Sequence, residues 1–572
     1  MIVRGASGSA GRLVATALVV AVFAPPTVPA EGPAPPGPSS EVEWQDPLRQ
    51  ERAASVPPDA VLEELAAVIG EIEFEILDVF DPNHPKERNW FFRAANTLHV
   101  KTRKRVIRHL LLFREGDLYS ARTLAESERL LREAEYLFDV RILPVAYGED
   151  NRVRVRVVTR DVWTLQVGLS FGRSGGENDY SIGLSDSNIL GLGKDVKVQR
   201  SENVDRTSNL YRYIDPNLAG TRWRLLLGYQ DNSDGFQRRL GIGRPFFSLD
   251  TRRSGNFTFL NFDRVDPLYT LGEVRDRFRH VEDRYEAGAG FSRGLVRSAT
   301  RRWSAGLTYA RDRFEMAPGY APSPDQPEDR LLVYPWIGFQ YIEDDHATVR
   351  NLDRIERTED INFGVEASVR LGWSSQNFGA DRDQLVLFSS LRTGFLPGPR
   401  QLILVGGHAS GRFGQDRSEN VLVGGQARYD VRTFGRHKFH VAASVDVADN
   451  LDGEKQLLLG GDSGLRGYPL RYQEGDRRYL VSLEQRFYTP WQVLRLVNIG
   501  AAVFFDAGEA WFDGSRGDEF ELGLLRDVGF GLRLASTRSS RGAMMHVDVA
   551  FPLDGDDSID RVQFLVAARD SF

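Results

Sequence analysis

The ten residues Trp-Thr-Leu-Gln-Val-Gly-Leu-Ser-Phe-Gly, numbered 163–172, alternate between apolar and small or polar side chains. A period of two predicts a β-strand with one apolar face and one polar face. Windows of about 8–12 residues, the length that a tilted strand needs to cross a bilayer, recur from residue 161 to the end of the chain. We therefore predict an all-β transmembrane antiparallel barrel over residues 161–572, closed because an open sheet leaves backbone groups unpaired in lipid.

A soluble β-sandwich or propeller would alternate in the same way. The chain shows no repeat of blade length, and apolar residues continue along one strand face to its end, with Phe564, Val566 and the last residue, Phe572, as a C-terminal strand signal. The composition, 41% hydrophobic and 27% charged, fits a barrel in which only alternate residues meet lipid. The net charge of -7 provides no overall basic surface, so we expect no nucleic-acid partner.

The first thirty residues resemble a secretion signal. Arg4 and Arg12 precede or flank an apolar stretch at 13–24, and small residues end at Ala30. This stretch is too short to span a bilayer as a helix. Residues 31–70 are rich in proline and predict a flexible linker, with a short helix at 61–69 near its end. The absence of cysteine excludes disulfides, thiolate metal sites and an N-terminal lipid anchor.

Residues 71–160 predict a separate small α+β module. Alternation at 71–80 indicates a strand, and helical spacing at 101–113 and after Ser120 indicates two helices. Two further strands are expected at 138–145 and 152–157, where valine alternates with arginine. The order β-α-α-β-β over about 90 residues can enclose one hydrophobic core.

A glycine-rich segment, residues 460–469, lies in a long polar connection between strands at about 438–448 and 478–488. In the strand after this connection the apolar residues share one face, and Glu484 falls on the other. Asp506 lies opposite the apolar face of the next strand, so alternation points both carboxylates into the lumen. An arginine on the connection can fold back to meet them. Such a cluster would fix the loop's position more than it would stabilise the fold.

The segment Leu465, Arg466, Gly467, Tyr468, Pro469 resembles the lumen-loop motif of the Omp85 superfamily, which includes BamA, TamA, the bacterial surface antigen D15 barrels and the two-partner secretion transporters. Phe504-Phe505-Asp506-Ala507-Gly508 is similar to a barrel-strand motif of that family, and the α+β module resembles its POTRA domain. By this resemblance, Arg466 reaches inward and pairs with Glu484 and Asp506 as barrel-wall partners. Gly467 permits close backbone approach, and Tyr468 packs against the lumen lining.

The expected number of strands differs between the two lines of argument. The resemblance implies about sixteen strands, whereas the alternating windows number eighteen to twenty. The excess lies between about residues 250 and 450. Either some windows are hairpins outside the membrane or this barrel is larger.

By resemblance, the function is non-enzymatic assembly, insertion or translocation of proteins at the cell outer membrane, with the POTRA-like module in the periplasm. A weak seam between the first and last strands would open sideways and pair with an incoming strand. On this hypothesis Leu165 and Phe564 should be close enough to cross-link. The expected partners are the lipid bilayer, unfolded client proteins, and a periplasmic or inner-membrane protein.

Two other functions remain open on the sequence: a dedicated export pore for one secreted partner, and a solute-conducting, porin-like channel. A single module, where BamA has several, favours a specialised member of the family.

Enzymatic chemistry is not expected. Gly461-Asp462-Ser463-Gly464 matches the nucleophile signature of trypsin-like proteases, but no flanking sequence supports the rest of that fold. The nine histidines lack metal-ligand spacing, and no nucleophile elbow is present. We therefore expect no catalytic residues, metal or cofactor.

Overall fold

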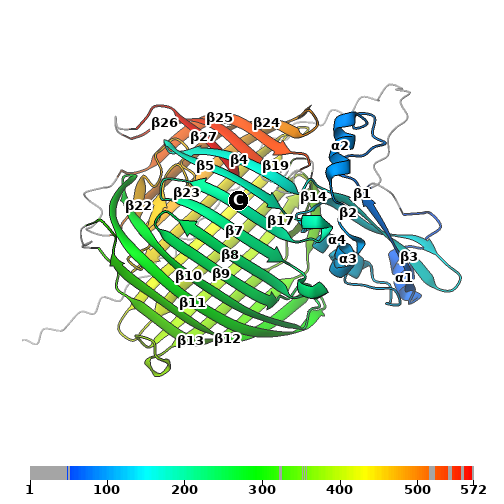
Figure 1. The fold of residues 1–572 in the computed structure, drawn as a ribbon, viewed down its shortest axis with the longest axis horizontal. Coiled ribbons are helices and arrows are strands. Elements are labelled where there is room, and N and C mark those ends of the chain that lie inside the picture. The colour runs from blue at the N-terminus through cyan, green and yellow to red at the C-terminus, as the bar shows by residue number, and fades with distance from the viewer. Residues whose placement is uncertain are drawn as a thin grey trace, which may run out of the picture. The chain divides into compact units, whose positions relative to one another are not determined.

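The computed structural model describes Leu48 and residues 52–320, 325–350, 352, 355, 357–513, 522–538, 544–555 and 559–569. The predicted signal peptide, most of the predicted linker and Phe572 lie outside these residues. Residues 45–572 form one compact unit, in which an α+β module precedes a barrel (Figure 1).

The module is built around a three-stranded sheet. Its elements are α1 (Asp59–Glu64), β1 (Val68–Leu77), α2 (Trp90–Leu98), α3 (Lys104–Leu110), α4 (Ala121–Arg132), β2 (Leu137–Tyr147) and β3 (Arg152–Asp161). The core of the module includes residues of three helices, α1, α3 and α4, and a further helix, α2, lies outside that core. The strand order is β1-β3-β2, with β1 parallel to β3 and β2 antiparallel to it. Leu62, Ile107, Leu131 and Val153 are fully buried in its core, and the side chain of Ser120 caps α4 as expected.

The module differs from the expected β-α-α-β-β order by two helices. Helix α1 ends at Glu64 instead of reaching 69, because Ala66 takes a left-handed conformation (φ 48°) and strand β1 begins at Val68. Leu62 belongs to the core, so the folded part begins before residue 71. Helix α2 was not predicted; it lies between the expected strand at 71–80 and the expected helix at 101–113, and within it only Phe92 is buried.

Twenty strands of the described chain close into one antiparallel barrel in sequence order, with β27 returning to β4. They are β4 (Leu165–Ser174), β5 (Glu177–Asp186), β6 (Asp195–Glu202), β7 (Thr207–Asp215), β8 (Arg224–Asn232), β9 (Gly235–Arg244), β10 (Arg253–Thr270), β11 (Glu273–Val296), β12 (Ala299–Met316), β13 (Arg330–Glu343), β16 (Glu366–Ser374), β17 (Gln384–Gly398), β18 (Gln401–Phe413), β19 (Ser418–Arg432), β20 (Lys438–Asp449), β23 (Arg477–Val493), β24 (Val497–Trp511), β25 (Leu525–Ser536), β26 (Met544–Pro552) and β27 (Gln563–Arg569). The predicted barrel is confirmed. The upper count from alternation is correct, and the sixteen strands implied by resemblance are wrong for this chain.

The outer face of the barrel is apolar at alternate positions. On β4, Leu165, Val167, Leu169 and Phe171 are exposed, with Val167 at 78% and Leu169 at 80% of their full accessible area. Side chains of the opposite parity face the lumen, where charged residues such as Glu484, Asp506 and Asp548 are buried. This arrangement matches a cylinder whose outer solvent is lipid. No helix among the described residues is long and apolar enough to cross a bilayer.

The strands place the two ends of the barrel in different surroundings. Turns that include short 3₁₀ segments at 189–191 and 218–220 lie at the end that contacts the module: Asn188 donates to Thr102 (2.8 Å) and Arg222 to the carbonyl of Leu111 (2.9 Å). We call this the module end. The opposite, or far, end includes the β4–β5 turn and a 3₁₀ segment at 376–378.

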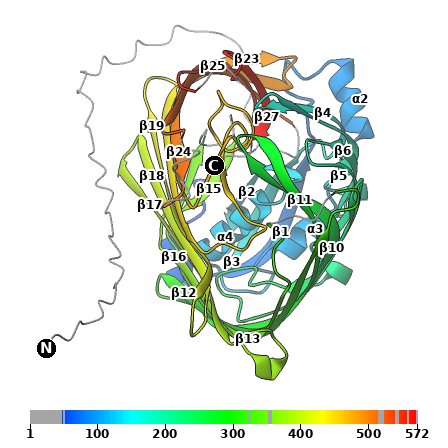
Figure 2. The ribbon, with the colours of Figure 1, turned by 90° about the vertical axis from the view of Figure 1, so that its left-hand side faces the viewer.

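A hairpin lies outside the barrel sheet. Strands β14 (His346–Arg350) and β15 (Thr358–Asn362) pair with each other in the connection between β13 and β16. Ile355, between them, packs on Tyr488, Ala535 and Met544, which are lumen-facing residues at the module end. The hairpin therefore lies in the module end of the lumen, and Figure 2, viewed along the barrel, shows β15 within the ring of strands. Of the two explanations for the excess, the larger barrel is the correct one.

Candidate functional site in the barrel lumen

The connection between β20 and β23 folds inward from the far end. It contains a small hairpin, β21 (Leu457–Leu459) with β22 (Gln473–Gly475), and the predicted motif lies between these two strands. Leu465 and Tyr468 are completely buried, together with Leu459 and Tyr472. Figure 2 shows this connection, in gold, running inside the ring of strands. We call residues 450–476 the lumen loop.

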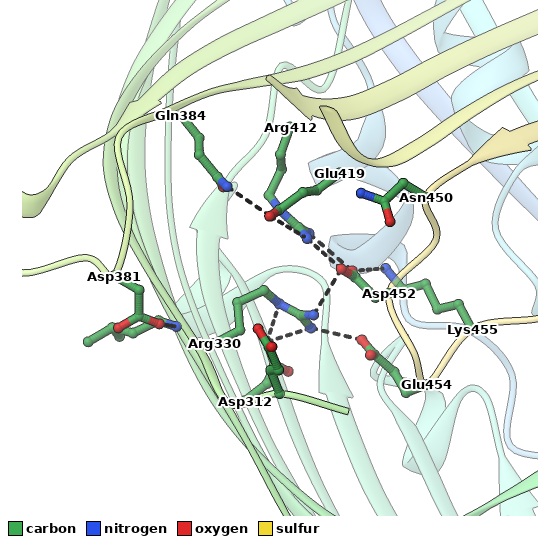
Figure 3. Close-up of polar contacts among 12 residues, drawn as sticks. Asp312, Arg330, Asp381, Gln384, Arg412, Glu419, Asn450, Asp452, Glu454 and Lys455 are labelled. Carbon is green, nitrogen blue, oxygen red and sulfur yellow. Dashed lines mark hydrogen bonds and ion pairs between the residues drawn. The ribbon is translucent and has the colours of Figure 1, made fainter. Parts of the chain in front are cut away.

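The root of the lumen loop is held by an ion-pair network at the far end (Figure 3). Arg330 on β13 lies 2.9 Å from Asp312, 3.1 Å from Asp452 and 2.8 Å from Glu454. Arg412 on β18 also donates to Asp452, at 3.0 Å. The network borders a cavity of about 1150 Å³. The acidic and basic side chains of the network pair with one another, so the network anchors the lumen loop to the barrel wall.

The returning arm of the loop has a second anchor. Arg471 makes a bidentate contact with Asp205 in the β6–β7 turn, at 2.8 and 2.9 Å, and its guanidinium lies over the ring of Tyr269 at 4.2 Å. Thr270 donates to Glu474 at 2.6 Å. Both arms of the loop are therefore bound to the rim of the barrel, and the tip lies deeper in the lumen.

Arg466 lies at the tip of the loop and is only 2% exposed. Its Nε and Nη2 atoms donate to the two carboxylate oxygens of Asp506, at 2.7 and 2.9 Å. Its Nη1 donates to Glu484 at 3.1 Å, and its guanidinium stacks 3.3 Å from the ring centre of Phe504. The fork of the guanidinium suits this bidentate geometry, which a lysine ammonium cannot reproduce.

The cluster around Arg466 extends beyond the two expected carboxylates. Nη1 also lies 3.4 Å from Asp548 on β26, and Arg533 on β25 contacts both Asp548 and Glu484. Arg486 donates to Glu484 at 2.8 Å. These additional residues have the same inward parity as Glu484 and Asp506, so alternation identifies their face. Alternation does not show that these residues meet, because a pattern within one strand does not reveal which strands are neighbours or how they are aligned.

Gly467 and Tyr468 fix the backbone of the tip. The amide of Gly467 donates to Asp527 at 3.0 Å, and a β-carbon at Gly467 would come within 2.6 Å of the Asp527 side chain. The hydroxyl of Tyr468 donates to the carbonyl of Arg526 at 2.7 Å and accepts from the Asp554 amide at 3.3 Å. The tip is thus bound to β25 and to the connection that follows β26.

The neck of the loop meets the first barrel hairpin. The carbonyl of Pro469 accepts from the amide of Gly461 at 2.9 Å, which closes the neck. Gly175 in the β4–β5 turn packs so tightly on this neck that a β-carbon there would lie 2.2 Å from the Leu470 nitrogen. Gly175 also has a left-handed φ of 53°, which favours glycine. The loop therefore contacts both the first strands and the last strands of the barrel.

The other predicted residues lie elsewhere. Phe564 is exposed on the outer face of β27, and Val566 pairs with Arg173 of β4; Phe572 is outside the described residues. The hydroxyl of Ser463, in the protease-like signature, bonds to the backbone of Gly460 and shapes the turn. Within the described residues no cluster of three metal-ligating side chains occurs.

One α+β module leads into a closed antiparallel barrel, and a buried loop arginine lies in its lumen. No family model and no curated protein matches the chain.

Solved structures that match the chain include BamA from Haemophilus ducreyi lacking POTRA domains 1–3, with 13% identity over 87% of this chain and 84% of that chain and a TM-score of 0.38. CdiB from Escherichia coli has 15% identity over 88% and 76% of the two chains, with a TM-score of 0.45. The FrpB iron transporter from Neisseria meningitidis (F5-1 variant) has 8% identity over 73% and 83%, with a TM-score of 0.38. All three scores are below 0.5 and carry no argument about function.

Proposed function

We propose that this chain inserts proteins into the outer membrane or translocates them across it, without catalysis, through a barrel seam that a lumen loop controls. The module would lie in the periplasm and receive unfolded client proteins. The observation that carries the proposal is the weak junction between the first and last strands of the barrel.

In the described part of the chain, this junction has a single pair of directly opposed residues, Val566 of β27 and Arg173 of β4. By contrast, β26 and β27 pair seven residues, and β4 and β5 pair ten. Separating β27 from β4 therefore breaks fewer backbone hydrogen bonds than separating β26 from β27 or β4 from β5. The exposed edges can then pair with an incoming client strand by β-augmentation.

The lumen loop is placed to couple to this seam. Arg466 and its partners tie the loop to β23, β24 and β26, on one side of the junction. The neck packs on Gly175 in the β4–β5 turn, on the other side. A shift of the loop during transport would therefore act on both edges of the seam.

An open solute pore fits the lumen less well. The lumen loop enters from the far end, and the β14–β15 hairpin occupies the module end. The single module in the described chain favours a specialised role, so dedicated export of one secreted partner is the second candidate. An adjacent gene for a large secreted protein would support that role.

The seam is tested by a disulfide between strands. Leu165 and Phe564 are too far apart for this cross-link. The pairing of Val566 with Arg173 places Phe564 opposite residue 175, and Leu165 lies about ten residues away along β4. Arg173→Cys with Val566→Cys joins a directly opposed pair, whose expected Cα separation of about 4.5–5.5 Å suits a disulfide. We expect oxidation to block client insertion or secretion and reductant to restore it.

The matched control is Ser170→Cys with Ser181→Cys, a directly opposed pair within the β4–β5 hairpin that leaves the seam free. Outer-membrane and secreted proteomes of cells carrying each variant provide the readout. Full activity with the seam locked would remove the lateral-opening mechanism.

A further inference from the structure

Helix α2 presents an apolar face away from the module. Trp90 is 74% exposed, Phe91 48% and Leu98 76%, whereas Phe92 is buried. Trp90, Ala94 and Leu98 are spaced by four residues and share one side of the helix. Asn89 caps the helix by accepting from the Phe92 amide at 3.1 Å, so this aromatic segment is a defined helix. Burying such a face would be strongly favourable in an apolar environment.

The helix is attached to the rim of the barrel. Phe92 packs with Val79 and Phe80 in a cluster that also includes Leu496 of the β23–β24 turn and Trp163, just before β4. Figure 2 shows α2 outside the ring of strands, beside β4. The helix therefore lies outside the lumen.

Buried ion pairs hold this attachment. Glu87, next to the helix, is 2% exposed and contacts Arg495 at 3.1 Å and Arg538 at 2.8 Å, both in module-end turns of the barrel. Burial raises the pKa of Glu87, but Arg538, the backbone amide of Asp81 and Arg495 together outweigh it, and the net pKa lies below the ordinary value.

The neighbouring barrel surface is apolar as well. The end of β23 and the turn that follows it expose Trp491, Val493 and Leu494. On the other side, β4 exposes Leu165 and Val167 from the lipid-facing belt. The apolar face of α2 is thus next to the membrane surface of the barrel at its module end, where aromatic residues of membrane proteins gather.

The charges around α2 have one sign. Between residues 82 and 100 the exposed charged side chains are Lys86, Arg88 and Arg93, and the only acidic residue, Glu87, is buried and paired. An amphipathic helix with aromatic residues on one face and basic residues beside it suits the boundary between acyl chains and phosphate headgroups.

We propose that α2 lies in the bilayer interface at the module end, with Trp90, Phe91 and Leu98 in the acyl region and the basic residues at the phosphates. The occupant of this face is the phospholipid leaflet. The helix would then hold the module against the membrane beside the seam. This inference requires the barrel to be embedded in a bilayer, but it does not depend on the transport function.

The test places a fluorophore on the helix. The chain has no cysteine, so Ala94→Cys can be labelled with an environment-sensitive maleimide dye while the aromatic residues stay intact. The full-length protein is reconstituted into vesicles of phosphatidylethanolamine and phosphatidylglycerol that contain doxyl-labelled acyl chains as quenchers. The matched control is Leu118→Cys, an exposed apolar position near the opposite end of β1.

We expect the label at residue 94 to be quenched severalfold more strongly than the label at residue 118. Adding Trp90→Glu and Leu98→Glu should abolish the difference while the barrel keeps its heat-modifiable migration on gels. Equal quenching at the two positions would overturn the proposal. So would a label at residue 94 that ignores the lipid quencher but responds to an added unfolded outer-membrane protein, because that result assigns the face to client docking.

Discussion

Arg466 has three buried acidic neighbours, Asp506, Glu484 and Asp548. Removing this guanidinium leaves their charge undercompensated in a site that excludes water, and breaking a buried pair in this way costs about 3–5 kcal/mol. The loop can escape part of that cost by leaving the lumen. We therefore expect the residue to set the loop's position more than the stability of the barrel.

Arg466→Ala and Arg466→Lys are both expected to unseat the loop, since lysine cannot make the bidentate contact with Asp506. The ratio of seated to unseated loop should fall by roughly two to four orders of magnitude on the alanine change. Protease sensitivity of the loop and client yield in the outer membrane measure the effect.

Arg293→Ala, at an exposed position on β11, is the matched control and should change neither property. A heat-modifiable band checks that each barrel is folded. Unchanged client yield in the Arg466 variants would refute the anchoring role.

At the scale of elements, two segments fill the lumen from opposite ends. The β14–β15 hairpin also joins the module to the barrel: Arg132 of α4 donates to both oxygens of Asp360, at 2.7 and 2.8 Å, and Thr358 donates to Asp139 at 2.9 Å. Motion of the module can therefore reach the lumen through this hairpin.

Leu352→Ser with Ile355→Ser should release the hairpin, because it removes the apolar contacts of both side chains with the lumen wall. Each lost contact costs about 2–3 kcal/mol. Single-channel recording in planar bilayers is expected to show a severalfold larger conductance. Phe434→Ser, at an exposed module-end position, should leave the conductance unchanged. Equal conductance for the unmodified protein, the double variant and Phe434→Ser would show that the hairpin does not obstruct the pore.

The attachment of α2 should depend on pH. Because Arg538 and Arg495 keep the pKa of Glu87 below its ordinary 4.5 despite burial, its contribution to stability is present above pH 4.5. That contribution is lost as the pH falls through the lowered pKa and the carboxylate is protonated. Near-UV circular dichroism during heating, between pH 7 and pH 3, should show an acid destabilisation that is smaller in Glu87→Gln. Parallel curves for the two proteins would contradict this assignment.

The whole molecule depends on lipid as the solvent of its outer surface. Leu169, 80% exposed on β4, should meet the acyl chains, while Ser170 points to the other face. Leu169→Arg is expected to lower the free energy of unfolding by about 2–4 kcal/mol if the residue is near the bilayer midplane, and Ser170→Arg by much less. Urea titration in phospholipid vesicles measures both. Equal losses, or a folded monomer in detergent-free buffer, would contradict a membrane barrel.

Much of this architecture follows from local pattern. Period-two alternation identifies the barrel strands and the inward faces of Glu484 and Asp506, because in a strand each side chain's face depends only on its parity. Closure was inferred separately, from the need to pair every backbone group in lipid. The same parity places Asp548 and Arg533 in the lumen. Arg466 was identified through the motif around it, since a single arginine in a loop has no periodic signal.

Tertiary structure alone decided which residues of different strands meet. The pairing of Arg466 with Asp548, the register of Val566 with Arg173 and the seat of Ile355 each join residues that are distant in sequence. Parity gives a face but no position along the barrel axis, so these contacts depend on strand register and closure. The same is true of α2: its helix forms locally, but only the barrel rim beside it determines which of its faces remains exposed.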